Sequence, residues 1–271
     1  MKFLVTGATG NVGRHVVDGL RRTGQSVRAM SRRPEKATLP TDVNVVHGDL
    51  GKPETMVEAL DGVERMFLFS MDGDTPLRTA PEIMARAREA GVRRVVVLSG
   101  DYEDRAVERA VEDSGLEWTF LRPMEFMLNA VDWADQISSE GVVRAPFGDW
   151  PSAMIHEADI ADVAVSALVE DGHDGRIYKL TGPEVVKRRD AVAAIGKAIG
   201  TEVRFEELTV EQARSLWGKE GYPEQVIEWL LGMGQDQPEE VRTPVPTVLE
   251  VTGRPPKTFA QWAAEHAEDF R

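Results

Sequence analysis

The sequence predicts an α/β protein in which a doubly wound parallel sheet is joined to a smaller, mostly helical C-terminal cap. Three observations lead to this fold class. Short apolar runs alternate with amphipathic stretches of helical length through the first half, as in a parallel sheet covered by helices on both faces. A glycine-rich loop follows the first apolar run and opens the first helix. After Pro123 the alternation stops, and the remaining chain is mostly helical in pattern.

The elements of the first half follow from the apolar runs and from the residues that end them. A helix over Asn11–Thr23 places Val12, Val16 and Leu20 on one face, and Gly24 follows in the position of a left-handed C-cap. The other elements predicted here are helices at Pro53–Leu60, Pro76–Ala90 and Asp101–Asp113, and strands at Lys2–Thr6, Val27–Met30, Val43–His47, Val63–Phe69, Val92–Leu98 and Glu117–Leu121.

The second half contains one more strand and several helices. Thr258 with Gln261 fits a capping box at the start of the last helix. We expect one domain over residues 1–150, which the helix 159–170 rejoins, and a cap over residues 151–271. The elements predicted here are the helix Asp159–Glu170, the strand Arg176–Leu180 and the helices Lys187–Ile199, Thr209–Gly218 and Pro223–Leu231.

The composition excludes several classes of function. Acidic residues outnumber basic ones 46 to 32, which gives a formal charge of −14 and argues against binding to nucleic acid or to an anionic membrane. The absence of cysteine excludes disulfides, thiolate catalysis and cysteine-ligated metals. No apolar run reaches the roughly 20 residues that a membrane span needs. None is long enough to form the apolar core of a signal peptide. We therefore expect a cytoplasmic protein.

The loop from Val5 to Gly13 has the spacing Gly-x-x-Gly-x-x-Gly between the first strand and the first helix. Gly7 permits a tight turn out of the strand, and Gly10 lets the backbone approach a pyrophosphate. Gly13 lets the helix pack closely against the strand, while the helix N-terminus offers N–H groups to phosphate. The pattern predicts a Rossmann dinucleotide-binding domain over residues 1–150.

The end of the second strand carries Ser31-Arg32-Arg33, with Lys36 shortly after and no acid before Glu35. An acid there would bind the ribose of NAD, whereas guanidinium groups bind a 2′-phosphate, so we expect NADP(H). The alternative is that these cations are only solvated. Contacts to adenine, ribose or the rest of the cofactor are expected where other strands end, at Asp49, Leu50, Phe69, Ser70 and Ser99.

Several segments resemble the atypical short-chain dehydrogenases, and more closely their NmrA-like branch. They are Thr6–Gly13, Ser31–Lys36, Gly48–Leu50, Leu121–Pro123, His156–Ala161 and Thr252–Phe259. The resemblance implies a Rossmann domain, a substrate-binding cap and NADP(H). The family includes quinone and dye reductases, aromatic ether reductases and transcriptional co-regulators that bind the dinucleotide. The cofactor-binding residues that it implies are Gly7, Thr9, Gly10, Asn11, Val12, Arg32, Lys36, Asp49 and Leu50.

The Tyr-x-x-x-Lys pair of ordinary short-chain dehydrogenases is missing. In that pair a lysine lowers the pKa of the tyrosine that exchanges a proton with the substrate. No lysine lies between Lys52 and Lys179, and Tyr102 is followed four residues later by Ala106. Tyr102 is therefore a candidate proton donor without its lysine, or simply an exposed residue at the start of a helix.

Three functions remain open for such a chain. It can reduce a planar apolar acceptor, such as a quinone or a polycyclic aromatic ketone, by direct hydride transfer. It can bind NADP(H) as a redox sensor or co-regulator that acts through a protein partner. It can also be a non-redox tailoring enzyme acting on a polyketide-like aromatic. Residues that would line an apolar substrate pocket, or else pack between the domains, are Tyr102, Met124, Phe126 and Trp150.

We expect no metal site. His156, Glu157 and Asp159 are ligand types close together, but no second histidine follows at helical spacing. Asp159 is instead expected to cap the helix that follows it.

Overall fold

The computed structural model describes residues 1–72, 75–100, 105–235 and 238–271 of the chain. The chain divides into two compact units. Unit 1 contains Met1–Pro123, Glu157–Leu180 and Thr247–Arg254, and unit 2 contains Met124–His156, Thr181–Pro246 and Pro255–Arg271. Residues 124–150 group with unit 2, so the first unit ends earlier than the boundary at 150 that we expected, at the point where the chain leaves the last strand of the first half.

Unit 1 is built from a large sheet and the helices that cover it. Its strands are β1 (Lys2–Val5), β2 (Ser26–Ser31), β3 (Asn44–His47), β4 (Arg65–Phe69), β5 (Met71–Asp72), β6 (Thr75–Pro76), β7 (Arg94–Leu98), β8 (Glu117–Pro123) and β11 (Arg176–Leu180). Its helices are α1 (Gly13–Arg22), α2 (Val57–Leu60), α3 (Ala80–Glu89), α4 (Ala106–Glu112), α6 (Glu157–Val169) and α10 (Thr247–Thr252).

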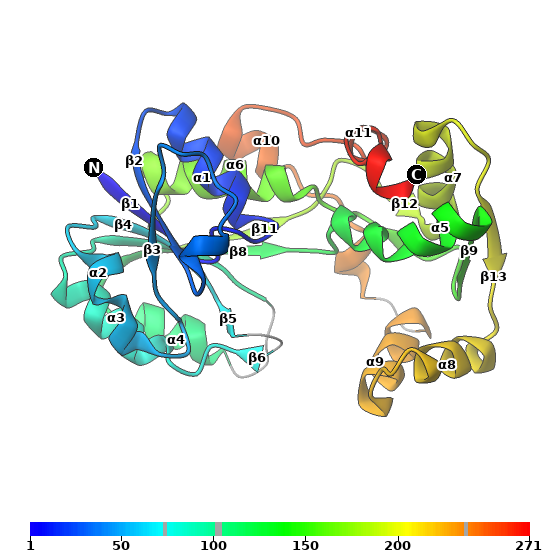
Figure 1. Cartoon of the computed structure of the whole chain (residues 1–271), viewed down its shortest axis with the longest axis horizontal. Coiled ribbons are helices and arrows are strands. Elements are labelled where there is room, and N and C mark those ends of the chain that lie inside the picture. Colours follow the sequence, from blue (N-terminus) through cyan, green and yellow to red (C-terminus); the bar gives the residue numbers. More distant parts are fainter. Residues whose placement is uncertain (73–74, 101–104, 236–237) are drawn as a thin grey trace. The chain divides into compact units, whose positions relative to one another are not determined.

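The described part of the chain forms a seven-stranded sheet in the order β11-β8-β7-β4-β1-β2-β3, and every pairing in it is parallel. The chain runs outward from β1 to β3, crosses back to β4 and then runs outward on the other side. Helices α1, α6 and α10 lie on one side of the sheet, and α2, α3 and α4 lie on the other (Figure 1). This arrangement confirms the doubly wound α/β fold, and it places the topological switch between β1 and β4.

Helix α1 packs against α6 through a glycine. Val16, Val17 and Leu20 of α1 are fully buried, as their spacing predicted. A Cβ atom added to Gly19 would lie 2.7 Å from Cγ2 of Val165 on α6, which is too close for carbon atoms. The absence of a side chain at residue 19 therefore sets how closely the two helices approach.

Some elements begin at residues other than those predicted. Pro76 belongs to the short strand β6, and the helix after it begins at Ala80. The segment from Pro53 starts as a 3₁₀ turn before α2. Helix α4 begins at Ala106, and residues 101–104, where we predicted its start, lie outside the described residues. The prediction that Asp159 caps the next helix was wrong, because α6 begins at Glu157 and Asp159 lies buried within its first turn.

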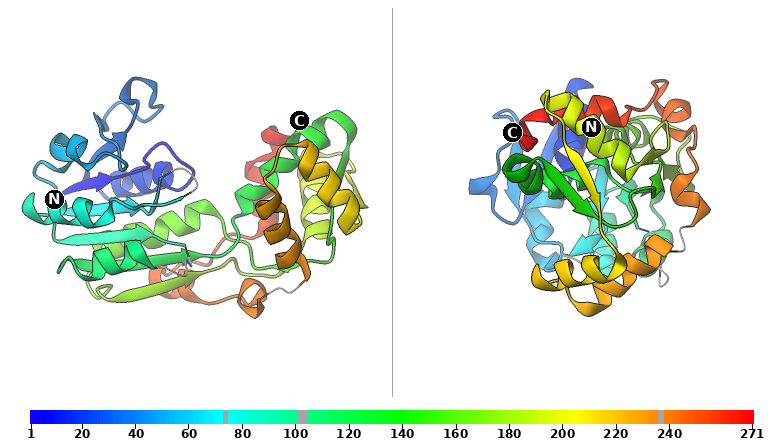
Figure 2. Two further views of the ribbon diagram at one scale, coloured as in Figure 1. Left: turned by 90° about the horizontal axis from the view of Figure 1, so that it is seen from below. Right: turned by 90° about the vertical axis from the view of Figure 1, so that its right-hand side faces the viewer.

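Unit 2 is mostly helical, with two small strand pairs. Its apolar cluster includes the fully buried Phe259 and Trp262 of the last helix, whose start at Thr258 has the predicted capping box with Gln261. Helices α8 and α9 lie side by side (Figure 2). The elements of unit 2 are β9 (Val142–Ala145), β10 (Pro151–Ser152), β12 (Val186–Lys187), β13 (Arg204–Glu207), α5 (Ala134–Glu140), α7 (Arg188–Ile199), α8 (Val210–Lys219), α9 (Glu224–Gln235) and α11 (Phe259–Glu265).

The helices in the described residues are all too short or too polar to cross a membrane.

The contact between α1 and α6 gives a testable prediction. Gly19→Ala should destabilise the protein by about 1–2 kcal/mol, because overpacking costs roughly 1–3 kcal/mol and the better helix propensity of alanine returns up to about 1 kcal/mol. Val165→Ala in the same chain should remove the clash, so a double-mutant cycle in urea should show a coupling of about 1 kcal/mol between the two sites. Additive effects of the two substitutions would contradict this packing.

Candidate functional site

The predicted cofactor residues gather at one edge of the sheet. Because the sheet is parallel, the carboxyl ends of β1, β2, β4 and β7 meet at the same edge. Gly7 follows β1, Arg32 follows β2, Phe69 ends β4, and Ser99 follows β7. The other predicted cofactor residues lie in the loops or turns at this edge, and they are Thr9, Gly10, Asn11, Val12, Lys36, Asp49, Leu50 and Ser70.

The glycine loop brings the start of α1 against the end of β1. Gly7 has a positive φ of 58°, and its carbonyl accepts a hydrogen bond of 2.9 Å from the N–H of Gly10. A Cβ atom on Gly13 would lie only 2.1 Å from the oxygen of Gly7. Within the described structure no side chain caps the N-terminus of α1, and the first turn of this helix contains no acidic residue. The positive end of the helix is therefore available to an anion at this loop.

Two hydroxyl groups lie beside this loop. The Oγ1 atom of Thr6 accepts a hydrogen bond of 2.9 Å from the N–H of Phe69, which ties the ends of β1 and β4 together. The Oγ atom of Ser70 is buried and has no hydrogen-bond partner among the described residues. A buried hydroxyl without a partner costs free energy, which a polar ligand at this edge would recover. The glycine loop and the Ser70 hydroxyl, which has no partner among the described residues, thus fit a dinucleotide.

The turn after β2 carries cations that are not held by carboxylates. Arg32, Arg33 and Lys36 are exposed, and no ion pair to any of them is found in the described part of the chain. The Oγ of Ser31 accepts a hydrogen bond of 3.1 Å from the N–H of Arg33 and so shapes the turn. By contrast, Arg21 on α1 is bound to Asp42 through both nitrogen atoms Nε and Nη2. The cations after β2 are therefore available for a phosphate.

The loop after β3 is fixed by Asp49. Its Oδ1 accepts a hydrogen bond of 3.0 Å from the N–H of Gly51, and its own N–H donates to Oγ1 of Thr55 at 2.9 Å. These bonds hold Leu50 in place as well, and its carbonyl accepts a hydrogen bond of 2.6 Å from Thr79.

A buried carboxylate links the carboxyl ends of β7 and β8. Glu108 of α4 is 3% exposed and accepts hydrogen bonds from Oγ of Ser99 at 2.8 Å, Nη2 of Arg122 at 2.8 Å and Nε of Arg105 at 2.9 Å. Burial raises the pKa of Glu108, but the hydrogen bonds from Arg122, Ser99 and Arg105 outweigh it and leave the pKa below its ordinary value. Glu108 is therefore ionised at neutral pH, and it holds Ser99 at the edge of the sheet.

The sequence did not identify this network. Ser99 was predicted as a cofactor contact, whereas Glu108 was not singled out within the predicted helix Asp101–Asp113. Arg122 belonged to a segment that carried only the family resemblance. The candidate proton donor Tyr102 lies outside the described residues.

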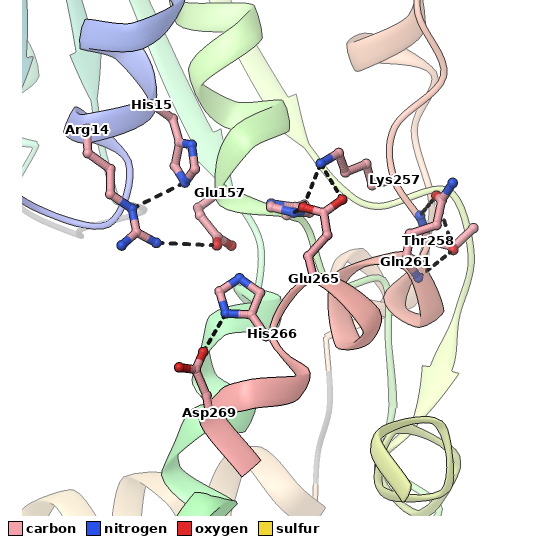
Figure 3. Close-up of polar contacts among 10 residues, drawn as sticks. Arg14, His15, Glu157, Lys257, Thr258, Gln261, Glu265, His266 and Asp269 are labelled. Atoms are coloured by element: carbon pink, nitrogen blue, oxygen red, sulfur yellow. Dashed lines mark hydrogen bonds and ion pairs between the residues drawn. The ribbon is translucent and has the colours of Figure 1, made fainter. Parts of the chain in front are cut away.

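The residues considered as metal ligands are engaged in other interactions. In unit 1, Oε1 of Glu157 lies 4.0 Å from Nη2 of Arg14, whose Nε donates to His15 (Figure 3). In unit 2, Glu265 accepts hydrogen bonds from Lys257 at 2.6 Å and contacts Nε2 of His156 at 3.2 Å. Within the described residues no group of three or more histidine, aspartate or glutamate side chains is arranged to hold a metal ion.

The residues predicted to line a substrate pocket lie in unit 2. Met124, Phe126 and Trp150 are each half-buried. Phe126 forms a parallel bridge with Ile155, and the N–H of Trp150 donates to the carbonyl of Phe147 at 2.9 Å. Their contact with a substrate stays a prediction.

Several known proteins share the sequence or the fold of this chain. A profile of the NmrA-like family matches residues 1–240. The chain is 44% identical to a (4-alkanoyl-5-oxo-2,5-dihydrofuran-3-yl)methyl phosphate reductase of Streptomyces griseus, over 99% of both chains. It is 32% identical to an NAD(P)H azoreductase of Xenophilus azovorans, also over 99% of both chains. Its fold is similar to that of an NADPH-dependent quinone oxidoreductase of Escherichia coli solved with NADPH, with a TM-score of 0.81, 24% identity and coverage of 97% and 99%.

The Glu108 network predicts a pH-dependent effect on stability. Glu108→Gln should destabilise the protein by about 2 kcal/mol at neutral pH, because it leaves two arginines without their shared carboxylate, although both are partly exposed. A carboxylate with a lowered pKa stabilises the fold above its usual pKa near 4.5, and this contribution is lost as the pH falls through its lowered value. Urea unfolding at several pH values should therefore show the difference from wild type shrinking in acid.

The matched control for that measurement is Glu112→Gln. Glu112 binds only Arg105 of the same network and is 31% exposed, so its loss should cost about 0.5 kcal/mol or less. Equal effects of the two substitutions would show that Glu108 does not hold the network together.

Proposed function

Because the chain belongs to the NmrA-like family, we propose that it is an NADPH-dependent reductase that transfers a hydride to a planar, conjugated acceptor. Unit 1 binds the cofactor, and unit 2 supplies residues that recognise the acceptor. One juxtaposition supports the cofactor assignment above all: the uncapped start of α1 is pressed against Gly7 at the same sheet edge as the unpaired cations after β2.

The phosphates of the cofactor have two separate places at this edge. The pyrophosphate fits the glycine loop, where the backbone of Gly7 and Gly10 leaves room and the helix start is positive. The 2′-phosphate of NADPH fits Arg32 and Lys36. Their guanidinium and ammonium groups would bind it with charge-assisted hydrogen bonds. An acid at the end of β2, where Ser31 and Arg32 stand, would have favoured NAD(H) instead.

The relative at 44% identity supports a proposal for the class of acceptor. Its name describes a furanone whose carbon–carbon double bond is conjugated with both the lactone carbonyl and the alkanoyl carbonyl. Such a ring would accept the hydride of bound NADPH at the carbon that bears the (phosphooxy)methyl group. The electron pair of the double bond then becomes an enolate shared by the two carbonyls, and a proton from solvent completes the reduction at the neighbouring ring carbon. We propose that this chain reduces an acceptor of this kind.

Such an acceptor accounts for the missing Tyr-Lys pair. In an ordinary carbonyl reduction the product is an alkoxide, which needs a strong proton donor in the active site. A β-dicarbonyl enolate is a much weaker base and a stable anion, so no acid in the site has to protonate it as it forms, and solvent can do so afterwards. Quinones share this property, because the reduced anion is delocalised. The ionised Glu108 holds Ser99 and Arg122 in place and has no proton to give.

The cofactor assignment predicts a selective loss. Arg32→Ala together with Lys36→Ala should raise the Kd for NADPH by about 10–100-fold, because charge-assisted hydrogen bonds to a phosphate are lost, while the Kd for NADH should change less than threefold. Fluorescence titration of both nucleotides measures this. Arg86→Ala, which only removes a surface pair with Glu82 on α3, is the control. Equal weakening of both nucleotides would contradict the assignment.

The reaction itself is tested by oxidation of NADPH against a panel of acceptors. We expect fast oxidation with alkanoyl furanone phosphates, slower oxidation with quinones and little with simple polycyclic ketones. Tyr102→Phe should keep most of this activity, because solvent supplies the proton, and a loss of more than about 100-fold would make Tyr102 the proton donor. No oxidation with any acceptor would favour a redox sensor or a non-redox enzyme.

A further inference from the structure

Three consecutive cations open helix α7 in unit 2, and the middle one differs from its neighbours. Lys187 and Arg189 both bind the carboxylate of Asp149 at 3.1 Å, and Arg189 also binds Glu207 at 2.8 Å. No carboxylate forms an ion pair with Arg188 in the part of the chain that the structure describes.

Arg188 differs from Lys187 because successive side chains alternate between the two faces of a two-stranded ribbon. Strands β10 and β12 are antiparallel, with Pro151 opposite Lys187 and Ser152 opposite Val186. The N–H of Arg188 donates to the carbonyl of Trp150 at 3.1 Å, which extends this ladder by one pair. Successive side chains point to opposite faces, so Trp150, Ser152 and Arg188 share one face, and Lys187 lies on the other.

This shared face contains polar groups whose hydrogen-bonding capacity is not fully met within the described residues. The Nε1 atom of Trp150 and the Oγ atom of Ser152 are buried and have no hydrogen-bond partner among the described residues, and Ser152 is 1% exposed. The guanidinium carbon of Arg188 lies 5.6 Å from the centre of the Trp150 ring, and one of its nitrogens donates to the carbonyl of Pro146. Most of the five donors of Arg188 are not used by these contacts.

The electrostatic surroundings agree with a site that lacks its counter-ion. Burial lowers the pKa of the Arg188 guanidinium, and Glu125, acting through space without an ion pair in the described structure, offsets this only in part. A guanidinium removed from water is unfavourable unless an anion accompanies it. Unpaired donors on one face, rather than acceptors, point to an anionic ligand.

We infer that Arg188, with Trp150 and Ser152, forms a binding site for the phosphate of a phosphomonoester acceptor. This inference rests on the proposed function and names which part of the acceptor unit 2 recognises. A planar guanidinium binds two phosphate oxygens at once, the Trp150 ring holds it in orientation, and the Ser152 hydroxyl and Trp150 N–H supply two further donors. The ring and alkanoyl chain of the acceptor lie outside this site and carry no charge for it to bind.

The test compares a furanone methyl phosphate with its hydroxymethyl analogue, which lacks only the phosphate. Arg188→Met should raise the KM for the phosphorylated acceptor by about 10–100-fold and leave the KM for the analogue within about twofold, because only the charge-assisted contact is lost. Arg189→Met is the matched control, and it should change both values less than threefold, because that arginine is already paired with Asp149 and Glu207.

Ser152→Ala tests the site without a risk to folding. Its hydroxyl has no partner among the residues that the structure describes, so its removal should leave the Tm unchanged or higher, while the KM for the phosphorylated acceptor rises about 3–10-fold. Equal loss with both acceptors in Arg188→Met, or no loss in either variant, would overturn the site.

Calorimetric titration of the phosphorylated acceptor separates the two proposals. Binding to wild type that is lost in Arg188→Met supports the site even where no turnover is seen, and absent turnover then counts only against the reductase. Turnover of both acceptors with unchanged binding in Arg188→Met counts only against the phosphate site.

Discussion

The close approach of α1 to the end of β1 is the constraint on which the candidate site depends. A side chain at Gly13 would overlap the carbonyl of Gly7, so the helix can start at this strand only with glycine there. The same helix is held a second time where Gly19 meets Val165 of α6. The close contacts at Gly13 and Gly19, which both lack a side chain, fix the position and the tilt of α1. They thereby fix where its positive end faces, and the polar groups after β2 and β4 lie at the same edge of the sheet.

At the ends of β7 and β8, the charge of Glu108 rather than close packing holds the edge of the sheet together. Glu108 joins the ends of β7 and β8 and is kept ionised by two arginines and a hydroxyl. A buried carboxylate in this state fixes positions but cannot act as an acid. Chemistry at such an edge suits acceptors whose reduced form is already a stable anion. This agrees with a chain that lacks lysine between residues 52 and 179.

The sequence predicted the parts of the fold that have a strong period and missed those that pair only locally. The parallel sheet and its edge residues followed from apolar runs and from glycines at their ends. Strand β13 was missed because Arg204–Glu207 is largely charged and pairs with β9 alone. The Glu108 network joins residues 9 and 14 positions from it, so no local pattern reveals it. Helix α6 starts at Glu157, two residues before the predicted start at Asp159.

A strongly acidic chain can bind phosphorylated ligands only at local sites. A net charge of −14 repels anions at a distance, so binding requires cations that are locally free of carboxylates. Many arginines in the described residues fail that condition because they are paired, as Arg189 is with Asp149. Arg32 and Lys36 meet it by exposure after β2, and Arg188 meets it because strand alternation turns it away from Asp149. Where the backbone separates a cation from nearby acids, the overall charge no longer determines what binds.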